Sequence, residues 1–250
     1  MRVLGIIPAR LASTRLPNKP LQLLAGEPLI TRVIQRVVAH GILQDLVVAT
    51  DSQDIARVVD RSGIRSILTS DGHLSGTDRV AEAAARPEFS GFDAVANVQG
   101  DEPFLPREAL AGAIGRIAQG DDIGTAAAPL GAADATDPAR VKVVTDARGR
   151  ALYFSRAVIP YPREATDAAD ASYWQHVGLY VYTRAALATW VAAPPSAAEQ
   201  AERLEQLRAL HCGLTIGVAR LAEAAEPGVD TPDDLRRAEA HWHALLRVGT

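Results

Sequence analysis

Along the first half of the chain, short apolar runs rich in β-branched residues alternate with patterns of helical spacing. The runs predict strands at Val3–Ala9, Leu46–Ala49, Ile64–Leu68 and Ala94–Val98. The helical patterns predict helices at Pro28–His40, Ser52–Arg61, Ser75–Arg86 and Pro106–Ala118. Because strands that alternate with helices pair in parallel through right-handed crossovers, this half predicts an α/β sheet.

The pattern changes in the second half, where strands follow one another without long helices between them. These strands are predicted at Thr125–Leu130, Val141–Thr145, Ala151–Ser155 and His176–Tyr182. The second and third form a hairpin with its turn at Asp146–Gly149. A helix follows at Glu199–Leu210, then a short strand at Ile216–Ala219 and a helix from Thr231 to about Leu246. We expect one continuous domain, residues 1–250, of Rossmann-like α/β type: a central, mainly parallel mixed sheet, helices on both faces and a small β-rich lobe.

Composition places the chain among ordinary globular proteins, with 48% hydrophobic and 22% charged residues in 250. A net charge of −4 and few aromatic residues argue against a nucleic-acid partner. No secretory pattern opens the chain, and no apolar run approaches the ~18–20 residues of a transmembrane helix. We therefore expect a cytoplasmic protein that is not inserted in a membrane. The single cysteine, Cys212, excludes an internal disulfide, and its apolar surroundings in the sequence predict that it is buried.

The segment Ile6–Pro20 is the most informative part of the sequence. An apolar strand runs into a loop with three cations, two hydroxyl side chains and two prolines: Arg10, Ser13, Thr14, Arg15, Pro17, Lys19 and Pro20. Open α/β sheets bind ligands at the carboxyl ends of their strands. No Asp or Glu lies between Arg2 and Glu27 to pair with these cations. The loop therefore predicts a polyphosphate site, and the alternative is a solvated loop with ordinary surface charges.

Two carboxylates are candidate metal ligands. Asp101 lies in the loop Gln99–Pro103 directly after a buried strand, at the same edge of the sheet as the cationic loop. Asp230 precedes the capping residues of the last helix, and capping explains those residues without explaining Asp230. Gly-Asp-Glu-Pro is also favourable turn chemistry by itself. Beside a phosphate loop, however, the carboxylates favour Mg²⁺, which takes few protein carboxylates plus phosphate oxygens.

Polar side chains in the second half are of carboxylate- and hydroxyl-binding types: Arg156, His176, Tyr180, Glu205 and Gln206. His176 and Tyr180 share one face of a strand, where they also suit simple packing, and Glu205 suits a surface ion pair. The sequence has no G-x-G-x-x-G after the first strand, no P-loop and no G-x-S-x-G elbow. Dinucleotide binding, P-loop NTPase chemistry and a serine nucleophile elbow are therefore disfavoured.

Nine motifs occur in order over nearly the whole chain: IIPARLASTRLPNKPL, ATD, SGTDR, NVQGDEP, VKVV, ALYFSRA-IP, H-x-G-x-Y, LEQLR and GVDTPDDL. Together they resemble the 3-deoxy-manno-octulosonate cytidylyltransferases, also called CMP-Kdo synthetases. That family joins CTP to the acidic sugar 3-deoxy-manno-octulosonate (Kdo), giving CMP-Kdo and pyrophosphate for lipopolysaccharide synthesis. The N-terminal loop alone indicates only a nucleotidyltransferase, since enzymes that activate sialic acid and related sugars look similar there.

The resemblance implies a nucleotidyltransferase fold and a role for each candidate residue. Catalysis would rest on Arg10, Arg15, Lys19 and Asp101; the two arginines and Lys19, with Ser13, would grip the triphosphate. Nucleotide recognition would involve Ser75, Arg79 and Gln99, and the Kdo pocket would be lined by Arg156, His176, Tyr180, Glu205 and Gln206. Asp101 and Asp230 would bind Mg²⁺ as the cofactor.

The resemblance also implies a division of labour along the chain. Residues of about 1–125 would bind the nucleotide, and residues of about 126–220 would bind the sugar and, through the hairpin, a second subunit of a homodimer. Residues 227–247 would carry the metal loop and the last helix. Two segments match the family loosely: the Ala-rich approach to LEQLR, and Arg163–Ser172, which we interpret as a mobile loop that could close the site.

The expected reaction is attack of the sugar's anomeric hydroxyl on the α-phosphorus of CTP, in line with departing pyrophosphate. Positioning and cations would do most of the catalysis, and no side-chain general base is obvious. Two alternatives stay open on the residues alone. One is a cytidylyltransferase for sialic acid or 8-amino-Kdo, and the other is a catalytically silent protein that senses CTP.

Overall fold

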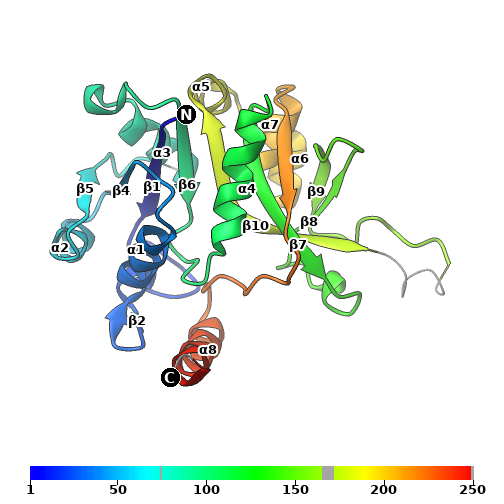
Figure 1. The fold of residues 1–250 in the computed structure, drawn as a ribbon. Coiled ribbons are helices and arrows are strands. Elements are labelled where there is room, and N and C mark those ends of the chain that lie inside the picture. Colours follow the sequence, from blue (N-terminus) through cyan, green and yellow to red (C-terminus); the bar gives the residue numbers. More distant parts are fainter. Residues whose placement is uncertain (74, 165–171, 249–250) are drawn as a thin grey trace. The chain divides into compact units, whose positions relative to one another are not determined.

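The computed structural model describes residues 1–73, 75–164 and 172–248. These form two compact units (Figure 1). Residues 2–105 and the C-terminal residues from Glu226 make the N-terminal unit, and residues 106–225, with Met1, make the central unit. Most of the interpreted loop Arg163–Ser172 lies outside the described residues. Among the residues described, no helix has the length and apolarity needed to span a bilayer.

Parallel strands form the sheet of the N-terminal unit (Figure 1). In spatial order they are β6 (Ala94–Val98), β1 (Val3–Ala9), β4 (Asp45–Thr50) and β5 (Arg65–Leu68). The predicted bounds of β1 and β6 are confirmed, and both strands are buried almost throughout. Such continuous apolar runs are typical of parallel strands that are covered on both faces. Parallel pairing brings the carboxyl ends of β1 and β6 to one edge of the sheet.

The helices between these strands are α1 (Leu29–His40), α2 (Gln53–Arg61) and α3 (Gly76–Ala84). Ser52 and Ser75 cap α2 and α3, because their side chains accept backbone N–H groups in the first turn of each helix. Gly41 ends α1 in the left-handed conformation. The unit also contains β2 (Leu23–Leu24), β3 (Glu27–Pro28) and the 3₁₀ turns η1 (Lys19–Leu21) and η2 (Pro87–Phe89).

The last helix, α8 (Pro232–Val248), supports the cationic loop of the N-terminal unit. An apolar cluster joins Leu16 of that loop to Leu24, Leu29, Val229 and Ala238. The loop and the segment that precedes α8 therefore share one buried support, although more than 200 residues separate them in the sequence.

The central unit holds a mixed sheet (Figure 1). Strand β7 (Ile123–Leu130) pairs in parallel with β11 (Ile216–Arg220) and in antiparallel with β10 (Tyr173–Thr183). The predicted hairpin is confirmed as β8 (Lys142–Thr145) and β9 (Ala151–Ser155). This unit also contains α4 (Arg107–Ala118), η3 (Asp134–Thr136) and α5 (Arg184–Ala192). The sequence pattern did not predict α5.

The single helix predicted over Glu199–Leu210 is wrong. The structure has two, α6 (Ala197–Glu202) and α7 (Gln206–His211). Arg203 ends α6 with φ 55, a left-handed conformation that is uncommon outside glycine. Across the break, the Glu199 carboxylate accepts bonds from Arg208 Nη2 at 2.5 Å and Nε at 2.9 Å, and both residues are buried. The ion pair holds the two short helices together at the break.

Cys212, expected to be buried, is exposed. The apolar stretch around it predicted a buried position, but α7 ends at His211. Cys212 therefore lies in the turn that terminates the helix, where the chain continues into Gly213 with φ 78.

Gly217 of β11 packs against a buried ion pair and leaves no room for a side chain. A Cβ there would lie 2.1 Å from Asp121 Oδ2 and 2.2 Å from Arg116 Nε. Asp121 is buried and pairs with Arg116 Nη2 at 2.7 Å and with Arg150 Nε at 2.6 Å. Because a methyl group would force this buried ion pair apart, Gly217→Ala should lower the free energy of unfolding by about 3 kcal/mol.

The matched control for this prediction is Gly115→Ala. Gly115 lies inside α4, and a Cβ there would meet nothing within 4 Å. Since alanine is the better helix former, this variant should raise the free energy of unfolding by up to about 1 kcal/mol. Urea unfolding of both variants measures the two values. Equal stabilities of the Gly217→Ala and wild-type proteins would contradict the interpretation.

Candidate functional site

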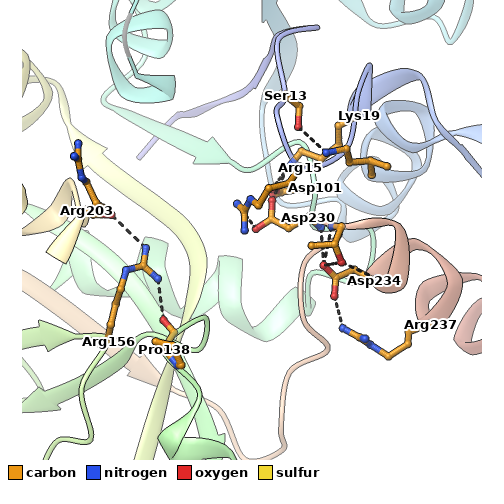
Figure 2. A network of polar contacts seen from close by, with 12 residues as sticks. Ser13, Arg15, Lys19, Asp101, Pro138, Arg156, Arg203, Asp230, Asp234 and Arg237 are labelled. Atoms are coloured by element: carbon orange, nitrogen blue, oxygen red, sulfur yellow. Dashed lines mark hydrogen bonds and ion pairs between the residues drawn. The ribbon is translucent and has the colours of Figure 1, made fainter.

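Four charged side chains of the N-terminal unit converge, and we call them the carboxylate–lysine cluster: Arg15, Lys19, Asp101 and Asp230 (Figure 2). Lys19 Nζ donates to Asp101 Oδ2 at 2.5 Å and to Asp230 Oδ1 at 2.8 Å. Arg15 Nη2 donates to the other oxygen of Asp230 at 2.8 Å. The expected approach of the two candidate carboxylates is thus seen, with one ammonium group bridging both.

Backbone contacts hold the two carboxylate loops together. The N–H of Val229 donates to the carbonyl oxygen of Asp101 at 2.8 Å. At Gly228, a Cβ would lie only 3.2 Å from Glu102 Oε1 and 3.3 Å from Asp101 O, so the close approach leaves little room for a side chain. The N–H of Asp230 donates to Asp234 Oδ2 at 3.2 Å. The capping chemistry predicted for this segment therefore also orients Asp230.

The pKa values of the cluster follow from its geometry. Burial would lower the pKa of Lys19, but the charges and hydrogen bonds of Asp101 and Asp230 raise it above the ordinary 10.5. Burial would raise the pKa of Asp230, but Lys19 and then Arg15 lower it below 3.8. At neutral pH, Lys19 is therefore an ammonium ion and Asp230 a carboxylate.

Arg10 and Ser13 complete the predicted loop. Arg10 is exposed just after β1 and forms no hydrogen bond or ion pair with another residue that the structure describes. Ser13 Oγ accepts the Leu16 N–H at 3.4 Å, within the loop itself. Arg10 thus keeps a free guanidinium at the carboxyl end of β1, where open sheets bind ligands.

The other predicted nucleotide residues lie in the same unit with different surroundings. Ser75 caps α3 and donates its hydroxyl to Asp78 Oδ2 at 2.9 Å. Gln99 lies just after β6 and donates to Asn97 Oδ1 at 3.2 Å. Arg79 is buried, and its guanidinium donates to Asp51 Oδ2 and to Thr69 Oγ1, both at 2.6 Å. These contacts make Arg79 a structural link of this unit, and its part in nucleotide recognition stays a prediction.

In the central unit, His176 and Tyr180 lie together on β10. Their ring centroids are 5.2 Å apart, and the Phe154 ring of β9 packs edge-on against His176 at the same distance. Burial lowers the pKa of His176 from 6.5 to about 4, so its imidazole is neutral at pH 7. Burial, followed by Tyr182 and Glu205, raises the pKa of Tyr180 well above 10. The pair therefore offers a neutral imidazole and a phenol that keeps its proton.

Arg156 is held by backbone carbonyl groups of the central unit (Figure 2). Its Nε donates to Glu202 O at 2.7 Å, Nη1 to Pro138 O at 2.9 Å and Nη2 to Arg203 O at 3.4 Å. The helix break at Arg203 therefore lies beside the guanidinium. These bonds use three of the five N–H groups, so one on each Nη is left for an anion. No carboxylate side chain of the described residues bonds to this guanidinium, which leaves its charge available.

Glu202 is a site residue that the sequence reasoning missed. Its Oε2 accepts the backbone N–H of Arg156 at 2.8 Å, and its Oε1 accepts the Ser155 hydroxyl at 2.6 Å. The carboxylate thus fixes the end of β9, and the carbonyl of the same residue fixes the Arg156 side chain. Glu202 lies next to the break between α6 and α7. The spacing of apolar residues did not predict this break, so it did not single out Glu202.

Glu205 and Gln206 begin α7 directly after the break. Glu205 is the N-cap residue of that helix, and it contributes to the raised pKa of Tyr180. Gln206 is buried. The structure therefore brings Glu205 near Tyr180. Glu205 and Gln206 also follow closely after Arg203, whose carbonyl oxygen accepts a bond from Arg156. His176, Tyr180 and Glu205 thus lie near one another in the central unit, and their part in binding a sugar with Arg156 stays a prediction.

The cationic loop after β1 and Asp101 after β6 lie at one edge of a parallel α/β sheet, where Asp230 from the segment before α8 joins them. Open α/β sheets bind ligands at this edge, which is the arrangement of a nucleotide-binding α/β protein. A family model described as cytidylyltransferase matches residues 4–216, and the chain belongs to this cytidylyltransferase family. Within it, the relatives are 3-deoxy-manno-octulosonate cytidylyltransferases, which confirms the family that the motifs resemble.

Three comparisons illustrate the likeness. The chain is 55% identical over 248 residues to 3-deoxy-manno-octulosonate cytidylyltransferase of Gemmatimonas aurantiaca, covering 98% of this chain and 96% of that protein. It is 50% identical to 3-deoxy-manno-octulosonate cytidylyltransferase 2 of Burkholderia ambifaria, covering 93% and 90%. A solved structure of CMP:2-keto-3-deoxy-manno-octonic acid synthetase complexed with CTP matches with a TM-score of 0.90 and 37% identity, covering 98% and 99%. The expected nucleotidyltransferase fold is thereby confirmed.

Proposed function

We propose that this protein transfers CMP from CTP to the anomeric hydroxyl of Kdo, giving CMP-Kdo and pyrophosphate for lipopolysaccharide synthesis. The carboxylate–lysine cluster is the observation that supports the proposal, since it gathers at one place cations of the kind that bind phosphate and carboxylates of the kind that bind Mg²⁺. The relatives are named for this sugar, which favours Kdo over sialic acid or 8-amino-Kdo. The CTP in the related solved structure supports the choice of nucleotide.

In the N-terminal unit, the cationic loop would bind the triphosphate of CTP. Arg10 has a free guanidinium, and Arg15 is largely exposed, so both can reach phosphate oxygens. Lys19 is held in place by its two carboxylate partners and would neutralise charge on the departing pyrophosphate. Ser13, Ser75, Arg79 and Gln99 stay candidates for contacts to the nucleotide.

Asp101 and Asp230 fit Mg²⁺ by the chemistry of their donor set. Both present carboxylate oxygens to one cationic atom, Lys19 Nζ, at 2.5 and 2.8 Å. No group of three or more potential metal-ligating side chains occurs among the described residues, so phosphate and water would complete the coordination, as Mg²⁺ prefers. When bound, Mg²⁺ would offset phosphate charge and lower the pKa of a coordinated hydroxyl.

In the central unit, Arg156 would bind the carboxylate of Kdo through the N–H groups that its carbonyl partners leave free. His176, Tyr180, Glu205 and Gln206 would bind hydroxyl groups of the sugar. Their role in this proposal is to hold the acceptor in a fixed orientation toward CTP. No side chain among them is assigned as general base.

A competition between acidic sugars tests the choice of acceptor. The enzyme is given CTP, Mg²⁺ and an equimolar mixture of Kdo, 8-amino-Kdo and sialic acid. The CMP-sugars formed are separated by chromatography, and mass spectrometry identifies and quantifies each one. CMP-Kdo should dominate the products. A majority of another CMP-sugar would replace Kdo in the proposal, and tight CTP binding without any product would support the sensor alternative.

Removing the Glu202 carboxylate should weaken sugar binding selectively. Glu202→Ala deletes the acceptors for the Arg156 backbone N–H and the Ser155 hydroxyl, so the end of β9 that carries Arg156 is held less firmly, although the carbonyl bonds to its guanidinium stay. We expect the KM for Kdo to rise about tenfold, with the KM for CTP unchanged. Steady-state kinetics with each substrate varied measure this. The exposed Glu223→Ala is the matched control and should leave both constants unchanged, while equal rises in both KM values for Glu202→Ala would refute the assignment.

We further propose a cytoplasmic homodimer that pairs through the hairpin of the central unit. Leu152 on β9 is 63% exposed and Tyr153 is 37% exposed, so the hairpin presents apolar side chains that a second subunit would cover. Light scattering on the purified protein should give twice the 26.5 kDa chain mass, and Leu152→Asp should shift it toward the monomer. A monomeric wild type would overturn this part of the proposal.

A further inference from the structure

The hydroxyl of Thr125 contacts two groups of β10, and their chemistry decides which partner donates. Thr125 lies on β7 and is fully buried. Its Oγ1 is 2.6 Å from the carbonyl oxygen of Leu179 and 2.9 Å from Nε2 of His176. The pairing of β10 with β7 shifts register between Val177 and Val181, and Leu179 lies in that irregular stretch.

Hydrogen-bond accounting fixes the direction of both contacts. A hydroxyl group has one hydrogen to donate, and a carbonyl oxygen can only accept. The Thr125 hydrogen therefore goes to Leu179 O, and the Thr125 oxygen is left as an acceptor toward His176. The second contact exists as a hydrogen bond only if His176 Nε2 carries a hydrogen and donates it.

The neutral imidazole carries a single ring hydrogen, and the contact with Thr125 places it on Nε2. Burial lowers the pKa of His176 to about 4, which keeps a second hydrogen off the ring at pH 7. Phe154 and Tyr180 pack against the ring with centroids 5.2 Å away. No hydrogen bond to Nδ1 comes from any residue in the described part of the chain, so this nitrogen is left with a lone pair.

We propose that Thr125 is a positioning residue that fixes the Nε2–H tautomer of His176, so that Nδ1 accepts a hydrogen bond from a hydroxyl group of the sugar. The sugar's part in this inference rests on the proposed function. The arrangement selects for a donor at this point of the substrate: a hydroxyl group satisfies Nδ1, whereas a carboxylate or a ring ether oxygen cannot. Thr125 therefore sets what His176 recognises without touching the substrate.

Long-range ¹H–¹⁵N correlation spectra of the histidine side chains test the tautomer directly. They are recorded on the full-length enzyme at neutral pH without substrates, and His176→Gln identifies the signal. The wild type should show a neutral His176 with its hydrogen on Nε2. Thr125→Val, which keeps the shape and removes the hydroxyl, should lose this single tautomer, and Thr125→Ser should restore it. A wild-type signal of the Nδ1–H form, or of imidazolium, would overturn the proposal.

Kinetics connect the tautomer to the substrate. Thr125→Val should raise the KM for Kdo about tenfold while leaving the KM for CTP unchanged, and Thr125→Ser should restore the wild-type value. An unchanged KM for Kdo in Thr125→Val, with the tautomer altered, would overturn the link to the sugar. An Nε2–H signal in an enzyme that turns over no acidic sugar would support the tautomer assignment and overturn the proposed function alone.

Discussion

Replacing Asp101 with alanine should lower kcat/KM for CMP transfer by about 10³-fold, equivalent to about 4 kcal/mol of transition-state stabilisation. Asp101 is one of the two carboxylates proposed to hold Mg²⁺, and it is also the closer of the two partners of Lys19. Its loss therefore removes a metal ligand and releases the ammonium group that should neutralise pyrophosphate. Steady-state kinetics at saturating Mg²⁺ measure the effect.

Asp233→Ala is the matched control for this change. Asp233 lies three residues from Asp230 on the first turn of α8, and its side chain is exposed and pairs with Arg236. Turnover of this variant should equal that of the wild type. Near-normal turnover by Asp101→Ala with Mg²⁺ would contradict the assignment of the metal site.

Lys19→Met should have two opposite effects. Turnover should fall by about 10²–10³-fold, the scale for removing one preorganised donor of positive charge. The free enzyme, however, should bind Mn²⁺ about tenfold more tightly or better, because the ammonium group 2.5 and 2.8 Å from the two carboxylates no longer competes with the metal. Electron paramagnetic resonance of Mn²⁺, titrated with enzyme in the absence of nucleotide, measures this affinity.

Two variants separate the charge of Lys19 from other causes. Lys19→Arg keeps a cation beside the carboxylates and should bind Mn²⁺ as weakly as the wild type. Arg10→Met removes a cation of the same loop that contacts neither carboxylate, and should leave the affinity for Mn²⁺ unchanged. If Lys19→Met bound Mn²⁺ no better than the wild type, the two carboxylates would not be the metal site.

The carboxylate–lysine cluster was predictable from the sequence because parallel strands place their carboxyl ends at one edge of a sheet. Lys19 follows β1 and Asp101 follows β6, and these strands are direct neighbours. Asp230 was predictable for a different reason. The residues that follow it suit the start of a helix, but helix capping gives no reason for an aspartate at position 230, which left a role in binding. In these cases, local sequence and topology point to the same place.

The missing parts depend on conformations that no local pattern indicates. Arg203 takes a left-handed conformation that is usually found at glycine, so its residue type did not indicate a helix end. Leu204 and Leu207 are buried, and their spacing also suits one continuous helix. Glu202 therefore looked like an ordinary helix residue. Arg79 looked like a ligand-binding cation, but its partners Asp51 and Thr69 come from the ends of other strands. The contact of Thr125 with Leu179 lies where the pairing of β10 changes register, which alternating apolar residues do not reveal.

The most direct test of the account is the release of pyrophosphate from CTP and Mg²⁺ with and without Kdo. The account predicts release that requires Kdo and that yields one CMP-Kdo for each pyrophosphate. Release without Kdo would indicate hydrolysis of CTP instead of transfer. No release with Kdo present, from an enzyme that binds CTP, would contradict the proposed function.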